Sequence, residues 1–205
     1  MSTIGVAFKN ITAADGSFTF GDTMFGRAVE DGDQFMLWDN DAYNLIIYTY
    51  YDGYGWSVMD AEGNESMVEG NTIEIAKGQV LWYLPVTPEN VITVSGQLED
   101  AGTQTIEFVP NDENGYCFSF VNPFPVDTKF SDLSAFCGDG DQFLLWDNNA
   151  YNLIIYTYYD GYGWSVMDAE GNEDMAAETD IAIPAGQGAY FLPCDAREWS
   201  VTFNY

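Results

Sequence analysis

The sequence contains no histidine and only five lysine or arginine residues among its 205. Without histidine, Ser-His-Asp and Cys-His catalysis and histidine-ligated metal centres are excluded. The 33 aspartate and glutamate residues give a net charge of −28, so the chain lacks the basic footprint that binds nucleic acid or an anionic membrane surface. We therefore expect its partners to be cations, neutral molecules or other proteins.

Long apolar runs and phosphate-binding loops are missing as well. No stretch of about 18 apolar residues occurs, and the opening segment MSTIGVAFKN lacks the basic region and apolar core of a signal peptide. Glycines stand in DGYG and AEGN, with no following helix and no lysine to reach a phosphate. We expect neither membrane insertion nor nucleotide chemistry. With so many acids, a chance carboxylate pair says nothing about glycoside hydrolysis, and we expect a protein that is not an enzyme.

What is present is a folded, aromatic-rich chain built on a repeat. Aromatic residues make up 17% of the sequence, whereas disordered acidic chains are poor in them. Residues 31–65 recur 108 positions later at 139–173, changed only from Met36 to Leu144 and from Asp41 to Asn149. The match then weakens but keeps its register through IEIAKGQVLWYLP and IAIPAGQGAYFLP. This duplication predicts two β repeats, over residues 1–100 and 101–205.

The local patterns predict strands almost throughout. Runs of β-branched and aromatic residues alternate with turn sequences such as YDGYG, DAEGNE and TPEN. The predicted strands of the first repeat and the start of the second are 35–38, 43–51, 55–58, 73–75, 80–84, 91–98 and 103–109. The one candidate helical turn is KFSDLSAF. The fold class is therefore all-β, with two tandem antiparallel β-sandwich or barrel-like domains.

The repeated strand YNLIIYTYY carries large apolar groups on both faces, because side chains alternate along a strand. One face belongs to the core. The other is either buried within the same domain or covered by the neighbouring domain, another subunit or a ligand that stacks on tyrosine rings. Aromatic residues beside turn acids also suit polysaccharide binding, unless the tryptophans are core anchors. The candidate carbohydrate or assembly contacts are Trp38, Tyr48, Tyr50, Tyr54, Trp146, Tyr156, Tyr158 and Tyr162.

Acidic turns suggest calcium, which takes oxygen ligands, although no turn has the spacing of an EF-hand loop. Solvated turn acids are the alternative, and no cofactor is expected to be required. The candidate Ca²⁺ ligands are Asp31, Asp33, Asp39, Asp41, Asp60, Glu62, Asp139, Asp141, Asp147, Asp168 and Glu170.

The three cysteines all lie in the second repeat. An offset of 108 places Cys117, Cys137 and Cys194 opposite residues 9, 29 and 86, which are lysine, valine and valine. Small apolar packing is favoured over a disulfide for cysteines matched by valine, and the redox compartment stays open.

From Gly115 the chain runs GYCFSFVNPFPVDTKFSDL, GDQFLLWDNNAYN, IAIPAGQGAYFLP and WSVTF. This order resembles the β-repeat modules of secreted bacterial surface proteins, with an Asn-Pro-aromatic-Pro turn, a Trp-Asp strand and a Gly-Gln-Gly-aromatic strand. The first repeat lacks the Asn-Pro turn and has Val80 where the motif has glycine. The resemblance implies extracellular, non-catalytic spacer, attachment or assembly units, and it implies no active site.

The sequence thus predicts a non-enzymatic structural protein, at the cell surface or outside the cell, that forms homo-oligomers or polymers. A tandem carbohydrate-binding module, whose two weak sites gain affinity by linkage, is the main alternative. A virion structural component is another.

Overall fold

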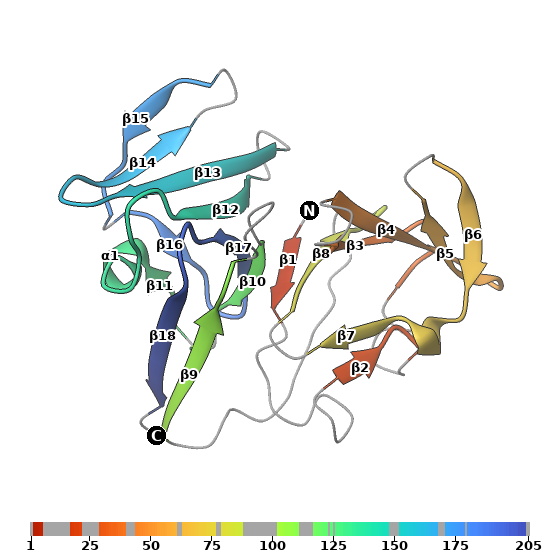
Figure 1. The fold of residues 1–205 in the computed structure, drawn as a ribbon. Helices are drawn as coiled ribbons and strands as arrows, with labels where there is room; N and C mark the ends of the chain where they lie inside the picture. Colours follow the sequence, from red (N-terminus) through yellow and green to blue (C-terminus); the bar gives the residue numbers. More distant parts are fainter. Residues whose placement is uncertain are drawn as a thin grey trace. The chain divides into compact units, whose positions relative to one another are not determined.

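The computed structural model describes residues 2–5, 17–21, 29–39, 44–60, 63–76, 79–87, 102–110, 117–122, 124, 126–147, 152–167, 171–178 and 180–203. Within these ranges the regular structure is almost entirely strand, with a short helix α1 (Phe130–Leu133) and a 3-10 turn η1 (Gly70–Thr72) (Figure 1). The all-β prediction is confirmed, and α1 lies within the expected KFSDLSAF turn. The chain divides into two compact units, Met1–Leu98 and Glu99–Tyr205.

The first unit is organised around a six-stranded antiparallel sheet in the order β1-β8-β3-β4-β5-β6. These strands are β1 (Ser2–Gly5), β8 (Val80–Leu84), β3 (Gln34–Asp39), β4 (Asn44–Tyr51), β5 (Gly55–Met59) and β6 (Glu65–Val68). A two-stranded sheet pairs β2 (Ser17–Thr19) with β7 (Glu74–Ala76). The predicted strand at 91–98 lies outside the described residues.

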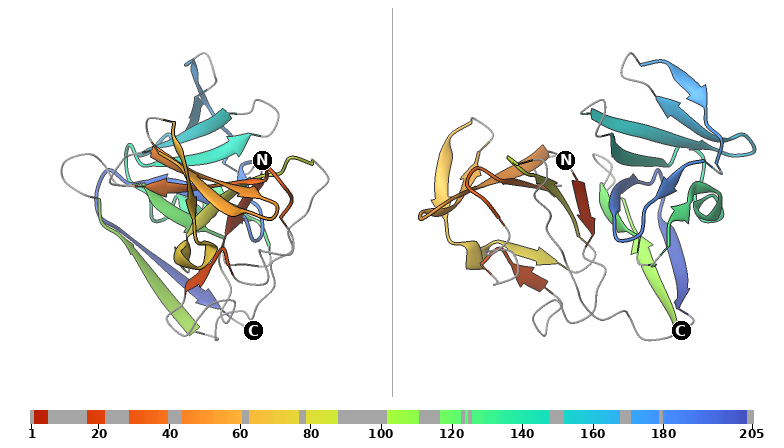
Figure 2. Two further views of the ribbon diagram at one scale, coloured as in Figure 1. Left: turned by 90° about the vertical axis from the view of Figure 1, so that its right-hand side faces the viewer. Right: turned by 180° about the vertical axis from the view of Figure 1, so that it is seen from behind.

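The second unit repeats the six-stranded sheet in the order β10-β17-β12-β13-β14-β15 (Figure 2). Its strands are β10 (Phe118–Val121), β17 (Gly188–Leu192), β12 (Gln142–Asp147), β13 (Asn152–Tyr159), β14 (Gly163–Met167) and β15 (Glu173–Met175). It also contains two two-stranded pairs: a short one of β11 (Thr128–Lys129) with β16 (Ala182–Ile183), and a longer one of β9 (Gly102–Phe108) with β18 (Arg197–Phe203).

The edge strands β1 and β10 occupy the same place in the two sheets although their sequences differ. Ser2 pairs with Tyr83, and Phe118 pairs with Phe191. Phe191 lies 108 residues after Tyr83, but Phe118 lies 116 residues after Ser2. The constant offset of 108 is therefore wrong for the edge strand, and Cys117 corresponds to the position before Ser2 rather than to a lysine. The spacing changes between the edge strand and the duplicated segment.

Aromatic rings build the core of each unit. In the first unit Phe20 lies 5.3 Å from Phe35 and 4.6 Å from Trp56 between ring centroids. In the second unit Phe143 stacks on Phe191 at 4.6 Å. Edge-on and offset ring contacts of this kind add about 0.5–1.5 kcal/mol each beyond the buried area. All three cysteines are free thiols, so rings and not disulfides hold the described cores together.

The β9–β18 ribbon carries a like-charged pair on its outer face. Glu107 stands directly opposite Glu198, and both side chains are exposed. Next to them, Thr105 and Ser200 share a hydrogen bond of 3.0 Å. Like charges directly across a sheet destabilise it, so this position is a local weakness of the ribbon.

We expect Glu107→Lys to stabilise the protein by about 0.5 kcal/mol, because it replaces repulsion with attraction across the ribbon. Urea unfolding at low salt measures the change in the free energy of unfolding. Glu107→Gln removes the repulsion without adding attraction, so it should be stabilised by about half as much. Equal stability of Glu107→Lys and Glu107→Gln would show that charge across the ribbon contributes nothing.

Candidate functional site

Each six-stranded sheet has an apolar face besides the one that carries the core. On β4, Tyr48 and Tyr50 point to the core while Leu45 and Ile47 point to the opposite side, where Ile47 pairs with Met36. We call this opposite side the second face. It consists of Met36, Trp38, Leu45, Ile47 and Trp82 in the first unit and of Leu144, Trp146, Leu153, Ile155 and Tyr190 in the second.

The second face is protected from solvent rather than bare. Trp82 is 2% exposed and Tyr190, its counterpart, is 1% exposed. The candidate residues Trp38 and Trp146 are half-buried on this face. Neither tryptophan therefore presents a freely exposed ring.

Four of the candidate tyrosines lie in the cores of their own units. Tyr48 packs edge-on against Phe20, at 5.3 Å between ring centroids. Its counterpart Tyr156 packs against Phe130 at 5.0 Å. Burial raises the pKa of the Tyr48 and Tyr156 hydroxyls. Tyr50 and Tyr158 contact the core tryptophans at 5.2 Å in the same way.

Tyr54 and Tyr162 are different, because they stand at the tips of exposed turns. The turn between β4 and β5 is closed by the Tyr54 amide, which donates to the Tyr51 carbonyl at 3.0 Å. Gly55 and Gly163 follow with φ of 95° and 90°, a backbone conformation that glycine adopts at little cost. The side chains of Tyr54 and Tyr162 are 84% and 82% exposed. The structure thus presents one free tyrosine at the same place in each unit.

Several candidate calcium ligands are used to hold turns. A carboxylate oxygen of Asp31 accepts from the amide of Asp52 at 2.8 Å, and Asp139 accepts from Asp160 at 3.0 Å. Asp60 accepts from the backbone amide of Asn64 at 2.7 Å and from its side-chain amide. Asp31 and Asp139 thus connect neighbouring turns, whereas the Asp60 bonds are local.

The remaining candidate ligands are spread along the sheets. Asp39 and Asp147 end β3 and β12, six residues and about 20 Å from Asp33 and Asp141 at the strand starts. Within the described ranges, no three acidic or cysteine side chains converge as a metal site. Asp41, Glu62, Asp168 and Glu170 lie outside the described residues. Calcium binding stays a prediction.

Asp33 is fully buried where β3, β4 and β8 meet. Its carboxylate accepts from the amides of Glu30 and Val86, both at 2.9 Å, and from the hydroxyl of Tyr83 at 2.7 Å. Its backbone carbonyl accepts from the amide of Tyr50 on β4. A buried carboxylate is costly unless such bonds satisfy it, so this residue is a structural anchor.

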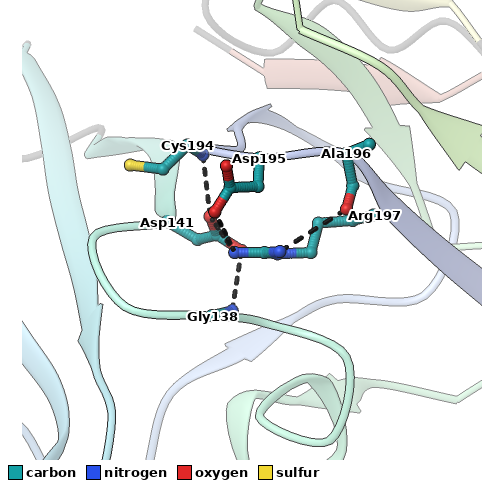
Figure 3. Close-up of polar contacts among 6 residues, drawn as sticks. All are labelled: Gly138, Asp141, Cys194, Asp195, Ala196 and Arg197. Atoms are coloured by element: carbon teal, nitrogen blue, oxygen red, sulfur yellow. Dashed lines mark hydrogen bonds and ion pairs between the residues drawn. The ribbon is translucent and has the colours of Figure 1, made fainter.

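Asp141 is the equivalent anchor of the second unit, but its third partner is a cation. Its carboxylate accepts from the amides of Gly138 and Cys194, both at 2.8 Å. The Arg197 guanidinium donates to both carboxylate oxygens, at 2.6 Å and 3.2 Å (Figure 3). This two-pronged pairing is stronger than a neutral hydrogen bond, and it raises the pKa of Arg197.

The residues around the two anchors differ at two positions, and the two differences fit each other. Where Tyr83 donates its hydroxyl to Asp33, the second unit has Phe191 and relies on Arg197. The position of Glu30 is taken by Gly138, where a Cβ atom would collide with the Arg197 guanidinium. Sequence reasoning missed this pairing. The available signal was that Arg197 is one of only five basic residues in the chain.

A second polar network was also not predicted from the sequence. Tyr159 and Ser165 both donate to the Glu173 carboxylate, at 2.9 Å and 2.5 Å. These hydrogen bonds hold the pKa of Glu173 below its usual value. In the first unit Tyr51 donates to Glu65. The network joins the long strand to the edge strand in both units.

Comparison of the chain with protein-family models, curated proteins and solved structures gave no match. Across the described ranges, no helix has the length and apolar character needed to span a membrane.

Arg197→Leu should destabilise the second unit by about 3 kcal/mol, because it leaves the buried Asp141 carboxylate without its cation. Urea unfolding followed by tryptophan fluorescence measures the loss. Adding Asp141→Asn should recover part of it, since the neutral amide needs no cation. A loss in Arg197→Leu of less than about 0.5 kcal/mol, the scale of an exposed ion pair, would contradict this role.

Burial and the hydrogen bond to Asp33 raise the pKa of Tyr83 far above its usual range. In the unfolded chain a tyrosine loses its proton near pH 10, so above that pH the folded state holds more protons and stability falls. We expect Tyr83→Phe to be less stable than the wild type at neutral pH. Above about pH 10, the free energy of unfolding of the variant should fall less steeply with pH, because its unfolding releases roughly one proton fewer. Urea unfolding between pH 8 and 11.5 tests this, and parallel pH profiles would contradict it.

Proposed function

We propose that this chain is a non-enzymatic structural protein, an extracellular surface or filament-type subunit whose two β units contact other copies. The observation that supports this most directly is the pair Tyr54 and Tyr162, more than 80% exposed at identical turn tips. Tyrosine is enriched at protein interfaces because its rigid ring offers a large contact area at a low entropy cost.

Exposed methionines lie on the hairpins that follow the tyrosine turns. Met67 on β6 and Met175 on β15 are 55% and 58% exposed and stand opposite Ser57 and Ser165 of the neighbouring strands. Methionine adapts its shape to a partner surface. Each unit therefore offers an aromatic and a flexible apolar contact on two hairpins that share one strand, β5 or β14.

Two equivalent contacts per chain make the subunit bivalent. Bivalent subunits form closed oligomers or open polymers, and linkage raises the strength of weak contacts. The net charge of −28 opposes association, so salt or calcium should favour it by screening. The resemblance to surface β-repeat modules points to the same kind of protein, and a virion component would use the same contacts.

We expect purified protein in millimolar calcium to form filaments, sheets or large oligomers, and the double variant Tyr54→Ser, Tyr162→Ser to lose them. Light scattering with negative-stain microscopy, in calcium and again in chelator, measures both. Disappearance of the particles in chelator would assign the acidic turns to calcium.

Val109→Ser is the matched control, since Val109 is also exposed, at 60%, but lies outside the hairpins. It should assemble as the wild type does. A monomer of 22.8 kDa in both buffers would contradict the assembly function.

A tandem carbohydrate-binding module is the second candidate, and the same turns favour it. The exposed Tyr54 ring can stack on a sugar face, and the neighbouring Asp52 can accept from sugar hydroxyls. Glycan-array binding by a monomer, lost in Tyr54→Ser, Tyr162→Ser, would support this function in place of assembly.

A further inference from the structure

A groove of about 350 Å³ runs along β18 in the second unit. Phe124, Leu133 and Val201 contribute apolar side chains to its lining, and Leu133 and Val201 are buried. Asp127 and Asp132 stand at its rim with exposed side chains. The volume lies in the range of ligand-binding pockets.

One wall of the groove is fixed by a buried asparagine. The side-chain amide of Asn122 donates to the carbonyls of Val126 and Ile183 at 2.8 Å and 2.9 Å. Its oxygen accepts from the amide of Phe124 and the hydroxyl of Thr128. Asn122 is fully buried, and these four bonds fix Phe124, Val126 and Thr128 relative to Ile183.

The opposite wall is a strand with a free edge. Among the described strands, β18 pairs with β9 alone. In an antiparallel pair every second residue directs its N–H and C=O away from the partner strand. Trp199, Ser200, Val201 and Thr202 of β18 all line the groove. An extended peptide could therefore pair with this edge, as in strand addition.

The charges and the burial of the lining residues determine which kind of ligand fits the groove. Asp127 and Asp132 disfavour an anion and attract a cation. Trp199 is only 8% exposed, so it offers no ring face on which a sugar could stack. Lysine and arginine combine an apolar stem with a charged head, which matches an apolar floor with an acidic rim.

We propose that this groove binds an extended segment of a partner protein, which pairs with the edge of β18 and places a lysine or arginine side chain in the groove. The stem packs on Phe124 and Val126, and the charged head lies between Asp127 and Asp132. This site is separate from the tyrosine turns, and it goes beyond self-assembly because a monomer suffices for binding.

The test is a titration of the full chain with the blocked pentapeptide acetyl-Thr-Val-Lys-Val-Thr-amide, followed by amide NMR shifts. We expect saturable shifts confined to residues 124–133 and 199–202. Replacing lysine by glutamate in the peptide should abolish them, and replacing both valines by proline, which removes the strand donors, should weaken them strongly.

Protein variants complete the test. Asp127→Asn with Asp132→Asn should weaken binding about tenfold, because two rim charges are lost. Asp160→Asn with Asp174→Asn removes the same charge from exposed positions outside the groove and should leave binding unchanged. Val126→Lys places a competing cation at the exposed Val126 and should block the peptide, with folding checked by the NMR spectrum.

The proposal is overturned if no saturable binding occurs, if the lysine and glutamate peptides bind equally, or if the shifts lie outside the groove. Equal binding to Val126→Lys would also overturn it. None of these results depends on whether the chain assembles, so failure of the groove and failure of the structural function are read separately.

Discussion

The burial of one carboxylate at the start of a central strand is the constraint on which each unit depends. Asp33 and Asp141 are fully buried, and each accepts two backbone amides from outside its own strand. Their backbone carbonyls accept from the next strand of the sheet. One residue thus connects the start of a central strand to the neighbouring strand on one side and to the segment after the other neighbour, and satisfying its charge requires all three.

The third donor to each anchor shows how a duplicated fold can diverge internally. Tyr83 supplies a neutral hydroxyl in the first unit, and Arg197 supplies a cation in the second. The glycine at position 138 makes room for the guanidinium. The scarcity of basic residues gives this arginine its importance, because the chain holds few other cations that could neutralise a buried acid.

The all-β fold and the central strands could be predicted because alternation and turn sequences are local signals. The predicted strand at 35–38 lies within β3, and that at 80–84 coincides with β8. Strand β6, with the sequence ESMV, was missed because it is short, mostly exposed and carries no alternating pattern. The equivalence of β1 and β10 was hidden because their sequences differ and the spacing to the repeat changes.

The candidate residues show the same limit. Sequence placed Tyr48 and Tyr54 together as contact residues, but one lies in the core and the other is exposed at a turn tip. Alternation shows that two faces exist without showing which face is buried. Asp33 was grouped with turn acids because burial depends on strands that are distant in sequence.

The divergence of the two anchors also bears on how a newly made chain finds its fold. The segments 31–65 and 139–173 are nearly identical in sequence, so each could enter the wrong unit during folding. In the second unit, the first segment and its flank would bring Glu30 to the position of Gly138, where a Cβ atom meets the Arg197 guanidinium. The glycine at 138 keeps this space open for the guanidinium, so the Arg197 pairing suits the flanking residue of the second copy and not that of the first.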